Sequence, residues 1–126
     1  YKKGFARGRI CVSNLTVLSS MLGTQYMPNL RNKILLIEDL NEPHHKIYRY
    51  LSQLELSYAA KGLSAILLGD FKNCGKKSAL NDVFATFADR FNIPFASGIP
   101  FGHIKKILAL KLGSQTIIDG DDVIIL

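Results

Sequence analysis

The sequence predicts an α/β fold with a parallel central sheet, flanking helices and a second, antiparallel sheet at the C-terminus. Two continuous apolar runs, 33–37 and 65–68, are typical of strands that are buried on both faces, as in parallel sheets. Apolar residues at helical spacing follow each run, which indicates the β-α-β alternation of such a sheet. After residue 106 the apolar residues recur at strand spacing, which predicts the antiparallel tail.

The first half of the chain predicts two strands and two helices. Residues 7–12 form a short strand, and Asn14 then caps a helix that runs to about Leu22. After the strand 33–37, Pro43 occupies a first helical turn that Asn41 is a candidate to cap. The core face of this second helix, which ends near Gly62, consists of Ile47, Leu51, Leu54 and Tyr58.

The second half predicts one more helix and the tail. The strand 65–68 closes at Gly69-Asp70, and a polar loop, 71–77, leads to a helix that Ser78 caps. Prolines at 94 and 100 bracket an extended piece and a loop. The tail strands are 107–112, 116–118 and 123–125, with Asp119-Gly120 as the turn between the last two. The core face of the third helix consists of Leu80, Val83, Phe84, Phe87 and Phe91.

Composition fits one globular domain, residues 1–126, with 48% hydrophobic and 21% charged residues. The net charge is +6, but the basic residues are scattered and no aromatic residues alternate with them, so we expect no nucleic-acid partner.

No apolar run approaches the roughly 18 residues of a membrane helix. Two cysteines without CxxC spacing fit a reducing compartment. Because Tyr1 stands where a strand is approached, we expect a domain cut from a longer protein.

Glu38 is the first candidate for chemistry, because it follows a buried strand at the sheet edge where open α/β folds place their active sites. There a carboxylate can orient a histidine and stabilise the imidazolium that proton transfer creates. The alternatives are a solvated strand-end acid or a cap for the next helix. Asp39 and Glu42 compete for the same role, although Asp39 is suited to bonding backbone amides.

His103 is the second candidate, on a loop where the preceding glycine permits a close backbone approach. The alternative is a surface histidine. An acid and a histidine are two members of a hydrolytic triad, but the sequence has no Gly-x-Ser-x-Gly elbow for the third. We therefore expect the nucleophile to lie on another domain.

Other motifs give no site. His44 and His45 are adjacent on a helix and cannot chelate one metal, so we expect a solvated first turn. Asp119, Asp121 and Asp122 lack the spacing of a calcium loop and fit a hairpin turn. We expect neither a metal nor an organic cofactor.

An ordered set of motifs resembles the C-terminal domain of the LD-carboxypeptidase family, the muramoyltetrapeptide carboxypeptidases. The set spans nearly the whole chain. It consists of Asn14-Leu15-Thr16, Leu22-Gly23-Thr24, Lys33-Ile34-Leu35-Leu36-Ile37-Glu38-Asp39, Gly69-Asp70-Phe71 with Cys74, Pro100-Phe101-Gly102-His103 and Lys111-Leu112-Gly113.

The resemblance implies a swivelling β/β/α-type domain that supplies Glu38 and His103 to a Ser-His-Glu triad. The serine would lie on an absent N-terminal domain, so we expect the isolated chain to be inactive. Asn14 and Asp70 become candidate substrate-binding residues. The family is cytoplasmic and commonly homodimeric, and it removes the terminal D-alanine from murein tetrapeptides in cell-wall recycling.

One departure and two alternatives remain open. Val12-Ser13 stand where the family usually has paired glycines, which affects the expected geometry on the substrate side. A sibling branch confers immunity to microcin C by similar chemistry. A non-catalytic binding or scaffolding domain of the same fold is the alternative from a different class.

Overall fold

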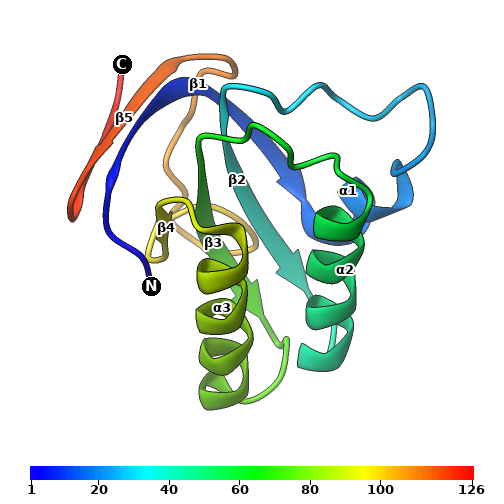
Figure 1. Cartoon of the computed structure of the whole chain (residues 1–126). Coiled ribbons are helices and arrows are strands. Elements are labelled where there is room, and N and C mark those ends of the chain that lie inside the picture. Colours follow the sequence, from blue (N-terminus) through cyan, green and yellow to red (C-terminus); the bar gives the residue numbers. More distant parts are fainter.

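The computed structural model describes all residues 1–126 and contains one six-stranded sheet and three helices (Figure 1). The strands lie in the order β4-β3-β2-β1-β5-β6, and β1 to β4 are parallel. In chain order the elements are β1 (Phe5–Asn14), α1 (Leu15–Ser20), β2 (Lys33–Leu40), α2 (His44–Leu56), β3 (Ala65–Lys72), α3 (Lys77–Phe91), β4 (Phe95–Ala96), β5 (Gln115–Asp119) and β6 (Asp122–Ile125).

The predicted α/β class is confirmed, and the central strands are buried on both faces. Leu35 and Ile37 of β2 belong to the larger apolar cluster, with the inward faces of all three helices. Ile34 and Leu36 belong to a smaller cluster on the opposite face. The sheet therefore has a helix-covered face and a second face that no helix covers (Figure 1).

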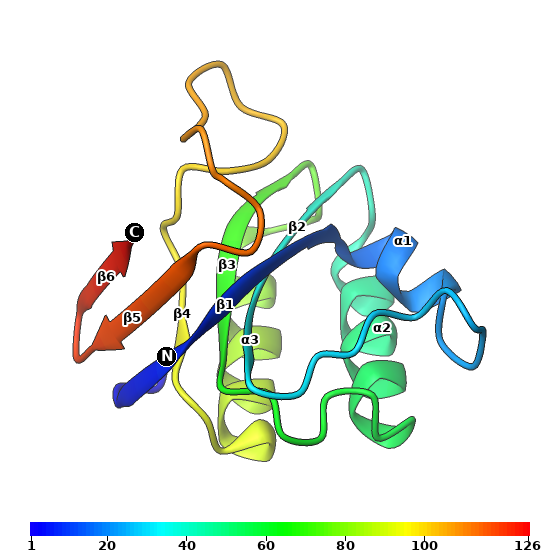
Figure 2. The same ribbon diagram turned by 90° about the horizontal axis from the view of Figure 1, so that it is seen from above.

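Residues 97–114, here called the histidine loop, pack on part of that second face, and Val123 and Ile125 of the C-terminal hairpin pack there as well. Ile99, Phe101 and Leu110 pack against the smaller cluster. Figure 2 shows this yellow and orange segment extending away from the helices between β4 and β5. The strand predicted at 107–112 is wrong: this stretch pairs with no strand, Ile107, Leu108 and Leu112 are exposed, and only Leu110 packs against the smaller cluster.

The prediction of a second, antiparallel sheet is also corrected. The C-terminal hairpin forms with Asp119 paired to Asp122, but β5 pairs antiparallel with β1 and so extends the same sheet. The physical reason is that β1 pairs with β2 along one side only. Its other edge has free N–H and C=O groups that β5 satisfies.

Helix boundaries shift by a few residues. The Asn14 side chain caps α1 as predicted, accepting the Val17 N–H at 3.0 Å. The caps predicted at Asn41 and Ser78 are not used: α2 begins after Pro43 and α3 begins after Lys76, and neither end has a side-chain cap. None of the three helices has the length and apolar character that crossing a membrane requires.

Candidate active site

A β-bulge lies where β2 and β3 reach their carboxyl ends. Gly69 and Asp70 of β3 together face the single residue Glu38 of β2, between regularly paired positions on either side. A bulge of this kind bends the strand and re-aims its side chains. Beyond the bulge β3 continues to Lys72, so the strand end predicted at Gly69-Asp70 is wrong.

Glu38, opposite the bulge, lies beside the histidine loop. Glu38 is only 5% exposed, and its Oε2 lies 2.7 Å from Nδ1 of His103. The His103 side chain is 49% exposed, and its Nε2 has no hydrogen-bond partner in the chain. The expected pairing of Glu38 with one nitrogen of His103 is therefore confirmed. The catalytic roles of both residues stay predictions.

Two glycines allow the loop to come this close. Gly102 has a φ of +120°, and a Cβ there would lie 3.1 Å from Cβ of Glu38. A Cβ on Gly69 would lie 2.5 Å from the carbonyl oxygen of Phe101, closer than such atoms approach in proteins. Glycine is therefore required at both positions for a packing reason, and at Gly102 for a conformational one as well.

The other two acids that competed for the histidine are bound elsewhere. Asp39 is 2% exposed and accepts hydrogen bonds from Thr16 and from the Leu40 backbone. Glu42 lies 3.4 Å from Nζ of Lys46, one helical turn away. The alternatives left open by the sequence are thus resolved in favour of Glu38, because successive side chains of a strand point to opposite faces, and Glu38 faces the histidine loop whereas Asp39 faces Thr16 of α1.

Asn14 and Asp70, the two candidate substrate-binding residues, both lie at this edge. The Asn14 amide nitrogen is 3.1 Å from Oε1 of Glu38. The Asp70 N–H donates to the Phe101 carbonyl at 2.7 Å and so fastens the histidine loop to β3, while its carboxylate has no partner in the chain. Their roles toward substrate stay predictions.

The Val12-Ser13 departure leaves the strand regular. Val12 of β1 pairs with Leu36 of β2 and packs on the smaller cluster. Neither residue has a positive φ. Whatever glycines do at these positions in the family, side chains fit here without strain.

No serine, threonine or cysteine of this chain is hydrogen-bonded to His103, whose one side-chain partner is Glu38. Burial raises the pKa of the Cys74 thiol, and burial likewise raises the pKa of Cys11 although Lys33 lowers it. Both therefore stay protonated and unreactive at neutral pH. His44 and His45 lie exposed in the first turn of α2. No group of three or more His, Cys, Asp or Glu side chains is placed to hold a metal ion.

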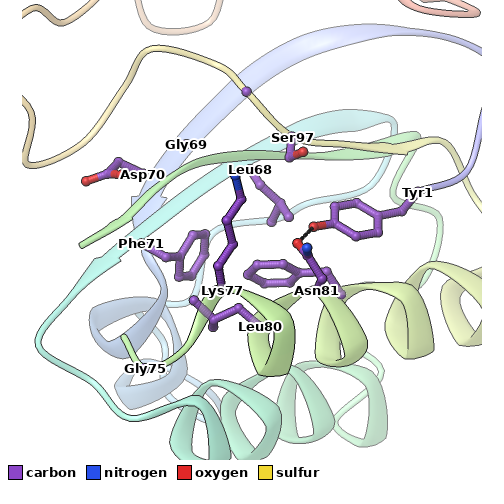
Figure 3. A pocket seen from close by; sticks show the side chains of 12 residues that line it. Tyr1, Leu68, Gly69, Asp70, Phe71, Gly75, Lys77, Leu80, Asn81 and Ser97 are labelled. Carbon is purple, nitrogen blue, oxygen red and sulfur yellow. Dashed lines mark hydrogen bonds between the residues drawn. The ribbon is translucent and has the colours of Figure 1, made fainter. Parts of the chain in front are cut away.

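A pocket of about 460 Å³ opens beside β3, against α3 and the start of the histidine loop. Figure 3 shows Tyr1, Lys77 and Asn81 around it, with the hydroxyl of Tyr1 donating to Oδ1 of Asn81 at 2.6 Å. Burial raises the pKa of Tyr1, and a hydrogen bond with Ser97 opposes this. Sequence reasoning missed this pocket because its walls come from both halves of the chain and no local motif marks it.

Comparison with known proteins identifies what the chain is similar to. Residues 7–118 match the profile of the LD-carboxypeptidase C-terminal domain. The murein tetrapeptide carboxypeptidase of Pseudomonas aeruginosa is 32% identical over 90% of this chain and 38% of its own length. The microcin C7 self-immunity protein MccF of Escherichia coli is 33% identical over 97% of this chain and 37% of its own.

Comparison with solved structures shows the same similarity. The crystal structure of the muramoyltetrapeptide carboxypeptidase from Oxalobacter formigenes superposes with a TM-score of 0.85 at 30% identity, covering 97% of this chain and 45% of that one. The chain thus spans less than half the length of each of these relatives.

Proposed function

The chain belongs to the LD-carboxypeptidase family, as its C-terminal domain, and we propose that it supplies the acid and the histidine of a Ser-His-Glu triad. In the complete protein, meaning this domain joined to a nucleophile-bearing N-terminal domain, the triad removes the terminal D-alanine from murein tetrapeptides. The observation that supports this most is the 2.7 Å contact between buried Glu38 and half-exposed His103.

The contact defines how the histidine works. A carboxylate oxygen can only accept a hydrogen bond, so we assign the proton of the neutral imidazole to Nδ1. Nε2 then has the free lone pair, and no group of the chain is hydrogen-bonded to it on this half-exposed ring. This tautomer is the one that a general base needs.

The reaction proceeds by acyl transfer. Nε2 of His103 takes the proton of the serine hydroxyl while the serine oxygen attacks the carbonyl carbon before D-alanine. Glu38 stabilises the imidazolium that forms. The imidazolium returns the proton to the leaving nitrogen as the C–N bond breaks, which releases D-alanine and leaves an acyl-serine. Water, activated by the same Nε2, then hydrolyses this ester.

Release of D-alanine tests the proposal. The complete protein should release D-alanine from a murein tetrapeptide, and this chain alone should not. The His103→Ala variant of the complete protein should lose at least about 10³-fold in kcat. Activity of the isolated chain, or an unimpaired His103→Ala variant, would exclude the proposed role.

A second candidate function has a specific observation in its favour. Identity to the microcin immunity protein, 33%, equals that to the murein enzyme within 1%. An amide next to an aminoacyl group linked to a nucleotide is therefore the second substrate class to assay. The retained Glu38–His103 pair argues against a scaffolding domain. The cytoplasmic location and the homodimer stay predictions.

A further inference from the structure

Asp39 is a buried carboxylate with no part in the proton path described above. It is 2% exposed and forms no ion pair. Each of its oxygens accepts two hydrogen bonds: Oδ2 from the N–H and the hydroxyl of Thr16, at 3.0 and 2.8 Å, and Oδ1 from Leu40 N–H and Asn14 Nδ2, at 2.9 and 3.1 Å. Burying a carboxylate is costly even when four neutral donors surround it, so its presence calls for a reason.

Asn14 joins this carboxylate to Glu38. Its Nδ2 donates one hydrogen to Oε1 of Glu38 and the other to Oδ1 of Asp39, both at 3.1 Å. Its Oδ1 accepts the N–H of Val17. The amide cannot be reversed, because its oxygen would then face two carboxylates and its nitrogen would face a donor. The orientation of Asn14 is therefore determined on all three sides.

The consequence reaches the histidine. With Oε1 of Glu38 held by Asn14, only Oε2 is free, and Oε2 is the atom that meets Nδ1 of His103. If Asn14 were not fixed, the Glu38 carboxylate could rotate. Either of its oxygens could then face the Asn14 amide, and Oε2 would no longer be held toward His103. Parallel pairing of Asn14 with Glu38 places the two side chains together at the carboxyl ends of β1 and β2.

We propose that Asp39 is a positioning residue that fixes Asn14, so that Asn14 locks the carboxylate of Glu38 with Oε2 toward His103. The effect on catalysis rests on the proposed function, whereas the effect on the histidine pair does not. A merely structural Asp39, which anchors the start of α1 through Thr16, would stabilise the fold without affecting that pair.

The first arm of the test observes the pair directly in the 126-residue chain. An imidazole N–H bonded to a carboxylate gives a proton resonance far downfield that is protected from exchange. We expect this Nδ1–H signal for His103 in the wild type, and its loss in Glu38→Gln. Asp39→Asn replaces one acceptor oxygen by an NH₂ group, and we expect it to lose or broaden the signal. The matched control is Asp89→Asn, an exposed acid on α3, which should retain the signal.

A gentler variant covers the case in which Asp39→Asn does not fold. Thr16→Val removes only the hydroxyl donor of the network, while Thr16→Ser retains it. We expect faster exchange of the His103 Nδ1–H in Thr16→Val than in Thr16→Ser. An unchanged signal in both Asp39→Asn and Thr16→Val, with loss in Glu38→Gln, would overturn the proposal. So would absence of the signal in the wild type, since no pair would then exist to be positioned.

The second arm measures kcat and KM of the complete protein. Asp39→Asn should lower kcat about 10- to 100-fold, the usual effect of residues that orient a catalytic group, and should leave KM within about twofold. Asp89→Asn should leave both unchanged. If even the wild type releases no D-alanine, the proposed function fails but the signal of His103 still decides the role of Asp39. If the wild type is active and Asp39→Asn matches it, only the positioning role fails.

Discussion

The two faces of the sheet are built differently. The face that three helices cover contains a cluster of 18 buried residues, whereas the face under the histidine loop contains a cluster of 7. Regular helices with spaced apolar residues cover the first face. A loop with positive-φ glycines, fastened by a few backbone hydrogen bonds, covers the second. Stability therefore resides mainly on the helix face, and His103, the proposed general base, lies on the loop face.

This separation teaches how one small domain meets two demands. A loop can bring His103 against a buried acid and still expose its other nitrogen, because no helix covers that side. Apolar burial on the helix face provides the stability that the loop face does not. We therefore expect variants on the loop face to lower activity more than stability, and variants on the helix face to lower stability more than activity.

The largest expected effect is on the loop face. Glu38→Gln should lower kcat of the complete protein by about 10⁴-fold, because a neutral amide cannot stabilise the imidazolium or hold its tautomer. Steady-state release of D-alanine measures this, and the thermal midpoint should change little by comparison. The matched control is Glu55→Gln, an acid on the helix face that is paired with Arg90. Equal activity of the two variants would contradict the expected difference between the loop face and the helix face.

The next effect is on the helix face. Phe87 is fully buried in the larger cluster, and Phe87→Ala should lower the free energy of unfolding by about 3–5 kcal/mol. Denaturant titration of this chain measures it. Phe5→Ala is the control, since Phe5 is 67% exposed and should cost little. A small loss at Phe87 would mean that the helix face does not hold most of the stability.

A smaller effect concerns the glycine that lets the loop approach. Gly102→Ala adds a Cβ 3.1 Å from that of Glu38 at a φ of +120°, so we expect a loss of about 1–3 kcal/mol in unfolding free energy. The His103 Nδ1–H signal should also shift. Gly98→Ala lies in the same loop with a φ of +89° and open space around it. If both variants cost the same, backbone conformation and not close approach explains the requirement.

The smallest effect is a pH dependence of stability. Both thiols pack with the helix-face cluster, and burial raises the pKa of each above the ordinary value of 9.0. Their native forms bind protons more tightly than the unfolded forms, so stability is full below pH 9 and falls as pH rises through that range. The loss at pH 9 is small, because the unfolded thiols are only half ionised there. Unfolding at pH 7.5 and 9, with Cys74→Ala as comparison, measures it; a rise in stability would contradict the sign.

The sequence by itself determined the α/β class, the order of the main elements and the candidates for the site, which are His103 and one acid out of Glu38, Asp39 and Glu42. These follow from local patterns: an apolar run of five residues at 33–37 marks a buried strand wherever it is placed, and the motif around His103 marks a loop. Such signals lie within a few neighbouring residues and need no partner.

Only the tertiary structure decided which acid meets the histidine, where the tail strands pair and what Asp39 does. Each depends on the register between segments far apart in the chain. The bulge opposite Glu38 exists only between β2 and β3, and β5 joins the sheet only because β1 offers a free edge. Since a shift of one residue would turn a side chain to the other face, pairing rather than composition assigns Glu38 to His103 and Asp39 to Asn14.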